Sequence, residues 1–201
     1  MIVARAVLGT CARLLGERLA ALGFEADGAV FRRYNPGGDV VIVDLQPHRS
    51  FLGDTQFLVN LAFLLDPAWR HYGFPPEKRP DTSHGTWWER VNPTDWEDHD
   101  DGEGFVEQWV VAGEADCATV VERLFARLGE RLPVVLDWLD RDRLRQAVAE
   151  GTPVGYATEL WLMAEDGPSD RLRAELFDSG PPEDGSDVDR AIWAYAHRFS
   201  R

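Results

Sequence analysis

The chain has 201 residues, 44% of them hydrophobic, and its 35 acidic and 21 basic residues give a formal net charge of −14. This length and apolar content indicate one domain, or one domain with an extension, rather than a disordered chain. The negative charge repels phosphate groups, so it argues against nucleic acids and anionic membrane surfaces as partners and favours a basic protein.

The first predicted element is a helix over residues 4–22, because apolar side chains recur there at helical spacing and Gly23 provides a C-cap. Cys11 lies on the apolar stripe of this helix, so we expect neither a signal peptide nor a lipid anchor. The sequence has no run of about 18 uncharged apolar residues, as a membrane span would need. Since Cys11 and Cys117 are the two cysteines and form no disulfide framework, we expect a cytoplasmic location.

Short strands are predicted after this helix, at residues 29–35, 39–46, 55–65, 86–91 and 105–111. NPGG at 35–38 is typical of a turn between the first two of them, and Pro47 is expected to end the second strand. A proline-rich loop at 73–85 and an acidic loop at 92–104 separate the later strands.

A short helix is expected at 66–73, where Asp66 is a favourable N-cap and Pro67 suits the first turn. The pattern becomes helical again from Glu114, and Pro133 is expected to end this segment. The remaining predicted helices span residues 141–150, capped by Asp140 and ended by Gly151, then 157–165, 169–177 and 187–199.

This order of a helix, then strands, then helices is typical of α+β proteins. We predict an antiparallel sheet of about four to five strands, with the N-terminal helix on one face and a C-terminal helical region. The expected division is an α+β domain at residues 1–150 and a C-terminal helical extension at 151–201 packed on it.

Five segments carry a family resemblance, in the order LGF (22–24), FRR (31–33), VDLQPHRS (43–50), FLVNLAF (57–63) and SHGTWWERV (83–91). Over residues 5–130 the chain resembles the uncharacterised bacterial domain-of-unknown-function family 4304. At 83–84 it has Ser-His where that family often has a cysteine–histidine pair, which argues against a metal or thiol role there. The resemblance implies the fold and a bacterial cytoplasmic setting, and it implies no reaction.

Alternation along the second and third strands separates an apolar face from a mixed one. The apolar face, predicted to meet the N-terminal helix, comprises Val41, Val43, Leu45, Phe57, Val59, Leu61, Phe63 and Leu65. The mixed face carries Asp44, Gln46 and Asn60 among aliphatic side chains. Either the C-terminal helices cover this face and the amides bond to loop backbone, or it is an open groove that presents them to a ligand. The groove would be rimmed by Arg33, Trp88 and Arg90.

Catalytic and cofactor motifs are missing from the sequence, which contains no HExxH, no GxSxG and no glycine-rich phosphate loop. We therefore expect no cofactor and no metal site, and the acidic loop does not fit the spacing of a calcium-binding EF-hand loop. His48, just after Gln46 and Pro47, is a candidate base if it lies near Asn60 and Asp44.

Two functions from different classes fit these observations. The first is a non-catalytic cytoplasmic binding protein, of the kind that neutralises a basic toxin or effector as an immunity protein does, and Trp96 in the acidic loop would help to bind that partner. The alternative is a small-molecule-binding domain or hydrolase with a site around Gln46, His48 and Asn60. The sequence leaves the oligomeric state open.

Overall fold

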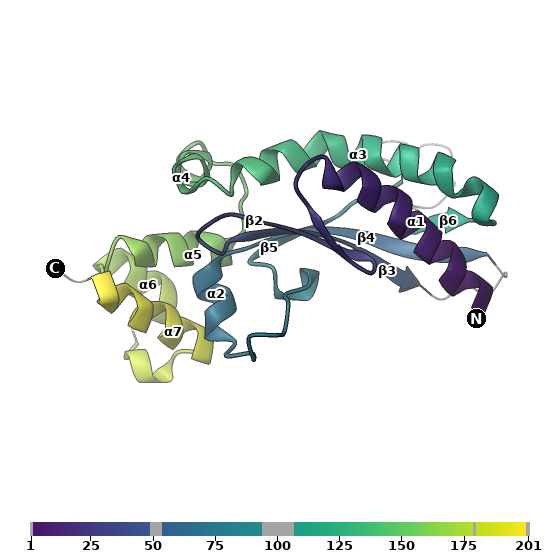
Figure 1. Ribbon diagram of the computed structural model, residues 1–201. Helices are drawn as coiled ribbons and strands as arrows, with labels where there is room; N and C mark the ends of the chain where they lie inside the picture. The colour runs from purple at the N-terminus through teal and green to yellow at the C-terminus, as the bar shows by residue number, and fades with distance from the viewer. Residues whose placement is uncertain (1, 49–53, 94–106, 179, 200–201) are drawn as a thin grey trace, which may run out of the picture.

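The strands follow the chain order across an antiparallel sheet, as their tight connections predict (Figure 1). The computed structural model describes residues 2–48, 54–93, 107–178 and 180–199, and in them the strands are β1 (Glu25–Asp27), β2 (Val30–Tyr34), β3 (Val40–His48), β4 (Thr55–Leu64), β5 (Trp87–Arg90) and β6 (Trp109–Val111). Strands β1 to β5 are neighbours in that order, and β6 pairs with the start of β4. The predicted α+β class is confirmed, whereas the short strand β1 was not predicted.

Helices precede and follow the sheet. In the described part of the chain they are α1 (Ile2–Ala20), α2 (Asp66–His71), α3 (Cys117–Asp137), α4 (Arg141–Ala149), α5 (Tyr156–Glu165), α6 (Asp170–Phe177) and α7 (Asp187–Ala196). The short 3-10 turns are η1 (Thr82–His84), η3 (Glu114–Asp116), η4 (Pro182–Asp184) and η5 (His197–Phe199). Asp140 caps α4 as predicted, because its side chain accepts the backbone N–H groups of Asp142 and Arg143.

Two prolines lie inside elements that they were predicted to end. Pro47 continues β3, because β2 pairs with β3 only as far as Asp44 and the missing N–H of Pro47 therefore breaks no ladder on that side. Pro133 lies inside α3, and Val135 in this helix and Trp138 directly after it are 1% and 2% exposed. Burial of these side chains against the sheet outweighs the local cost of proline in a helix.

The apolar face of the sheet is sealed by α1 and α3, which lie on the same side of it in Figure 1. The β3 and β4 side chains on this face are at most 2% exposed: Val41, Val43, Leu45, Phe57, Val59, Leu61 and Phe63. Cys11 on α1 and Cys117 on α3 are fully buried in the same core. Burial, reinforced by the neighbouring Cys117 thiol, raises the pKa of Cys11 to about 12, so Cys11 behaves as a small hydrophobe.

A buried ionic contact joins the later helices to the sheet. Asp39, directly before β3, is 1% exposed and accepts hydrogen bonds from Nε and Nη2 of Arg141, both at 2.7 Å. The same guanidinium donates through Nη1 to Glu165 in α5 at 2.7 Å, and Asp39 also accepts the backbone N–H of Asp66 at 2.9 Å. The pair of Asp39 and Arg141 thus connects the start of β3 with α2, α4 and α5. Helices α5 to α7 pack together and contact the sheet region through β5 and α2.

Candidate functional site

The pairing register places four side chains in one row across the mixed face of the sheet. Val30 on β2 pairs with Asp44 on β3, Asp44 pairs with Asn60 on β4, and Asn60 pairs with Arg90 on β5. Directly paired residues of antiparallel strands point to the same face, so the row lies opposite α1 and α3. The row therefore aligns the carboxylate of Asp44, the amide of Asn60 and the guanidinium of Arg90 across neighbouring strands.

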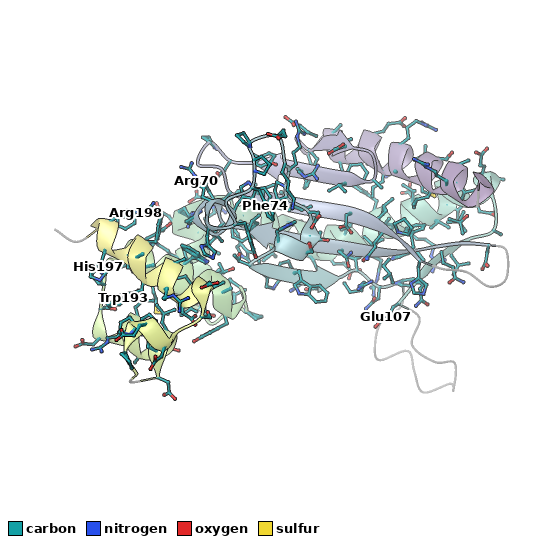
Figure 2. The ribbon with its side chains drawn as sticks, turned by 90° about the horizontal axis from the view of Figure 1, so that it is seen from below. Arg70, Phe74, Glu107, Trp193, His197 and Arg198 are labelled. Atoms are coloured by element: carbon teal, nitrogen blue, oxygen red, sulfur yellow. The ribbon has the colours of Figure 1, made fainter. Side chains whose placement is uncertain are left out.

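The chain itself covers only part of this mixed face. Ile42, Ala62 and Leu64 are fully buried, and the turn η1 packs against β3 and β4. Gly85, which directly follows η1, lies over β4, since a Cβ atom added to it would lie 3.0 Å from the Cβ of Ala62. Figure 2 views this face, with α7 and its neighbouring helices beside one end of the sheet. These contacts with the mixed face thus come from the segment between α2 and β5, whereas cover by the C-terminal helices was one of the two alternatives that the sequence left open.

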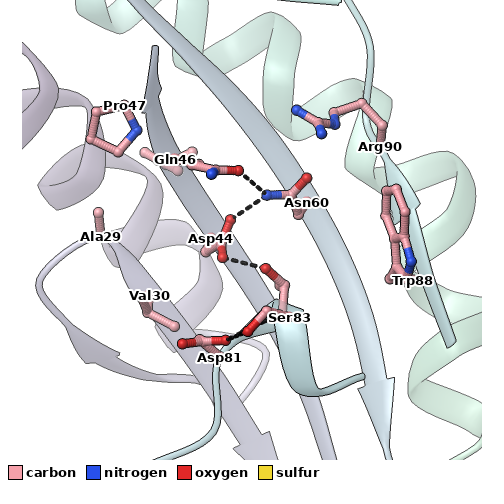
Figure 3. Close-up of a pocket in the computed structure, with 12 residues that line it drawn as sticks. Ala29, Val30, Asp44, Gln46, Pro47, Asn60, Asp81, Ser83, Trp88 and Arg90 are labelled. Carbon is pink, nitrogen blue, oxygen red and sulfur yellow. Dashed lines mark hydrogen bonds between the residues drawn. The ribbon is translucent and has the colours of Figure 1, made fainter. Parts of the chain in front are cut away.

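Beyond this cover, the mixed face forms a groove with a volume of about 590 Å³ (Figure 3). Ligand pockets in proteins typically measure about 300–1,000 Å³, so the groove has the size of a ligand site. Besides the row from Val30 to Arg90, its lining includes Gln46, Pro47, Asp81, Thr82, Ser83 and Trp88. The structure therefore brings together five of the residues that the sequence singled out, namely Asp44, Gln46, Asn60, Trp88 and Arg90.

Hydrogen bonds fix the orientation of the two amides in the groove. The Nδ2 atom of Asn60 donates to Asp44 Oδ1 at 2.7 Å and to Gln46 Oε1 at 3.3 Å. The second oxygen of Asp44 accepts the hydroxyl of Thr82 on η1. Both carboxylate oxygens of Asp44 are thus in use, whereas Asn60 Oδ1 and Gln46 Nε2 have no partner among the described residues. The groove presents one fixed acceptor and one fixed donor.

The rim opposite β5 includes Asp81 and Ser83, and His84 lies beside Asp81. Ser83 donates its hydroxyl and its backbone N–H to Asp81 Oδ1, at 2.5 and 3.0 Å, and His84 Nδ1 lies 2.8 Å from the same oxygen. Burial acts to raise the pKa of Asp81, but the Ser83 hydrogen bonds and the His84 charge outweigh it and lower that pKa. Ser83 contacts the acid and not the histidine, so this trio lacks the nucleophile–base contact of a hydrolase.

Arg90 and Trp88 form the wall on β5. The Nη1 atom of Arg90 is buried and has no hydrogen-bond partner, and no ion pair of Arg90 is found within the described residues. A buried unpaired donor costs about 1–3 kcal/mol, and more when it is charged. Trp88, two residues earlier on the same face, is 59% exposed. An unpaired cation beside an exposed aromatic ring is an arrangement that a bound ligand would stabilise.

Arg33 and His48 lie outside the groove lining. Arg33 pairs with Val41, so it points to the face of α1 and donates through Nη1 to the carbonyl of Leu22 at 2.8 Å. The mixed face receives Arg32 instead, which is 4% exposed and donates to the carbonyl of Pro80. His48 is exposed at the end of β3, four residues from Asp44, which corresponds to about 13 Å along a strand.

Sequence reasoning did not identify Thr82, Ser83 and Asp81 as part of the site. The sequence DTSH at 81–84 forms a capping box, a pattern that locates a helical turn but not its position over β3. Trp96 and most of the acidic loop at 92–104 lie outside the described residues.

Within the described residues, no cluster of three or more His, Cys, Asp or Glu side chains is arranged to hold a metal ion. Among the helices of the same part of the chain, none combines the length and the apolar character that crossing a membrane requires.

Comparison with known proteins gives one match. The model of a protein family described as a domain of unknown function, DUF4304, matches residues 15–141. This segment runs from the middle of α1 to the first residue of α4, so it includes the strands β1 to β6 and the groove. The curated proteins and the solved structures contain no match to the chain.

Proposed function

Since this chain belongs to the DUF4304 family, whose description names no activity, we propose its function from the groove: it binds a ligand there and is not an enzyme. The observation that carries the proposal is the buried Nη1 atom of Arg90, which lacks a hydrogen-bond partner in the wall of the groove. Native proteins pair nearly all buried polar groups, so an exception inside a groove of ligand size supports a binding role.

The groove also supports binding in preference to hydrolysis. Both oxygens of Asp44 accept hydrogen bonds from the protein, and Ser83 donates to Asp81, which is a weak base when ionised. His48, the candidate base, lies outside the lining. In the described groove the serine hydroxyl therefore contacts only a carboxylate and no imidazole base, and the preset amides suit recognition of a ligand.

A basic protein partner is the second candidate, and the net charge of −14 favours it. Such a partner would associate faster at low ionic strength, because opposite charges steer the encounter. The acidic loop that suggested it lies mostly outside the described residues, so this role stays a prediction. Affinity capture from native lysate at low and high salt tests it, and loss of a specific partner at high salt is the expected result.

The groove proposal predicts a ligand-dependent rise in melting temperature. A ligand at 100 times its dissociation constant adds about 2.7 kcal/mol of stability, or roughly 5–10 °C for a chain of this size. We expect Trp88→Ala and Asn60→Ala to abolish the rise. Tyr34→Ala, which removes an aromatic side chain that is 41% exposed outside the groove lining, should retain it. Thermal shift against a metabolite library measures this, and a library without a hit that depends on Trp88 or Asn60 would contradict the proposal.

A further inference from the structure

We infer that the groove binds a ligand with a carboxylate attached to a planar ring, the carboxylate on Arg90 and the ring against Trp88. The inference rests on the proposed binding function and specifies the chemical class of the ligand. Its basis is the distribution of charge, hydrogen bonds and exposed aromatic surface among the described residues of the groove.

The charge of the ligand follows from which groups in the groove are already paired. Both oxygens of Asp44 accept protein donors, and Oδ1 of Asp81 accepts two hydrogen bonds from Ser83, so these two acids are already partly satisfied by the protein. Arg90 is the one cationic side chain of the described lining, and its Nη1 atom is buried without a partner. A guanidinium in this state is satisfied by an oxyanion that accepts two of its N–H groups.

The charge of the surrounding groove favours a carboxylate over a phosphate. Asp44 and Asp81 place two negative charges in the same groove as the single positive charge of Arg90. A monoanion neutralises the guanidinium and meets little further repulsion, whereas a phosphate dianion brings a second charge towards the two acids. A carboxylate also matches the planar fork of the guanidinium.

The planar ring follows from the position of Trp88. Trp88 and Arg90 are two residues apart on one face of β5, which places their backbone positions about 7 Å apart. That spacing suits an aromatic acid, whose ring lies beside its carboxylate. Trp88 is 59% exposed, so it offers an aromatic surface at which a ring can pack. The free Asn60 Oδ1 and Gln46 Nε2 then remain for a polar substituent on the ring.

Arg90→Met separates a binding role from a structural one. Methionine replaces a partly exposed guanidinium, whose Nη1 atom is buried without a partner, by an apolar side chain of similar length, so we expect the melting temperature to stay the same or to rise. The same substitution should remove binding of a carboxylate. A lower melting temperature for Arg90→Met would show that the guanidinium stabilises the fold, and it would overturn the inference.

The direct test titrates the labelled protein with benzoate, with its uncharged isostere benzamide and with phenyl phosphate, and follows side-chain N–H resonances by NMR. We expect benzoate at millimolar concentration to shift the resonances of Arg90, Trp88 and Asn60. Benzamide, phenyl phosphate and the Arg90→Met variant should each give binding weaker by roughly tenfold or more. Arg13→Met, on the opposite face of the molecule and in an exposed ion pair, is the matched control and should bind benzoate as the wild type does.

Each of four results of this titration would overturn the inference. If benzamide binds as tightly as benzoate, or if the Arg90→Met variant still binds benzoate, the ligand is not held by its charge. Shifts of the Trp88 and Asn60 resonances would then still support binding in the groove. If phenyl phosphate binds more tightly than benzoate, the anion is a phosphate. If benzoate moves no groove resonance, the aromatic acid is the wrong class, and the library screen with Trp88→Ala and Asn60→Ala separately decides the proposed function.

Discussion

Replacing Arg141 by alanine is expected to lower the free energy of unfolding by about 3–5 kcal/mol, among the largest losses for a single substitution in this chain. The reason is the buried carboxylate of Asp39, which is 1% exposed and accepts two hydrogen bonds from this guanidinium. Without Arg141, Asp39 stays buried with its charge unpaired, and Glu165 keeps only the contact with Arg145 of α4. Urea denaturation of the wild type and the variant measures the difference.

The control for this prediction is Arg143→Ala in the same helix. Arg143 pairs with Asp137 at 3.0 Å, but both side chains are more than 60% exposed, so the loss should stay below about 1 kcal/mol. The double variant Asp39→Ala, Arg141→Ala should lose less than the sum of the two single variants, because the pair no longer leaves one charge unmatched. An Arg141→Ala variant as stable as Arg143→Ala would show that the contact contributes little.

Trp138→Ala is expected to cost about 3–5 kcal/mol by leaving a large cavity at the end of α3. Trp138 is 2% exposed and packs edge-on against Phe63 of β4 and Trp87 of β5, with ring centroids 5.8 and 5.0 Å away. Trp87 precedes Trp88, so this packing also holds β5 in the position that presents Trp88 and Arg90 to the groove. We therefore expect the variant to bind groove ligands less tightly as well.

Two controls accompany the Trp138 prediction in the same urea experiment. Trp138→Phe keeps an aromatic ring in the cavity and should lose clearly less stability than alanine. Trp88→Ala removes a ring that is 59% exposed and should change stability by no more than about 0.5 kcal/mol. Equal losses for Trp138→Ala and Trp88→Ala would contradict the role of Trp138 as a core residue.

The parts of the fold that the sequence predicted are those set by local patterns. Alternation along β3 and β4 separated the sealed apolar face from the face that carries Asp44, Gln46 and Asn60. The capping residues Asp140 and Gly151 placed the ends of α4 within a residue or two. Such signals depend only on residues close together in the chain, so a single sequence is enough to predict them.

The errors concern contacts between distant segments. The assignment of Arg33 to the groove was wrong. The face to which each residue of β2 points depends on how β2 pairs with β3, and this pairing places Arg32 on the mixed face. Pro133 was predicted to end its helix because the sequence does not show that Trp138 is buried. Pro47 was predicted to end its strand because the sequence does not show where the pairing of β2 with β3 stops. For the same reason, no local pattern predicted that the segment between α2 and β5 contacts the mixed face.

The openness of the groove is tested most directly by placing a cysteine in it. Gln46 is an exposed groove residue, and the native Cys11 and Cys117 are fully buried, so Gln46→Cys carries one accessible thiol with two internal controls. Under native conditions we expect an aromatic disulfide reagent to label Cys at position 46 within about tenfold of the rate of a free thiol, with Cys11 and Cys117 reacting only on unfolding. Protection of position 46 to the level of the two native cysteines would mean that the mixed face is closed, and the groove could not be a binding site.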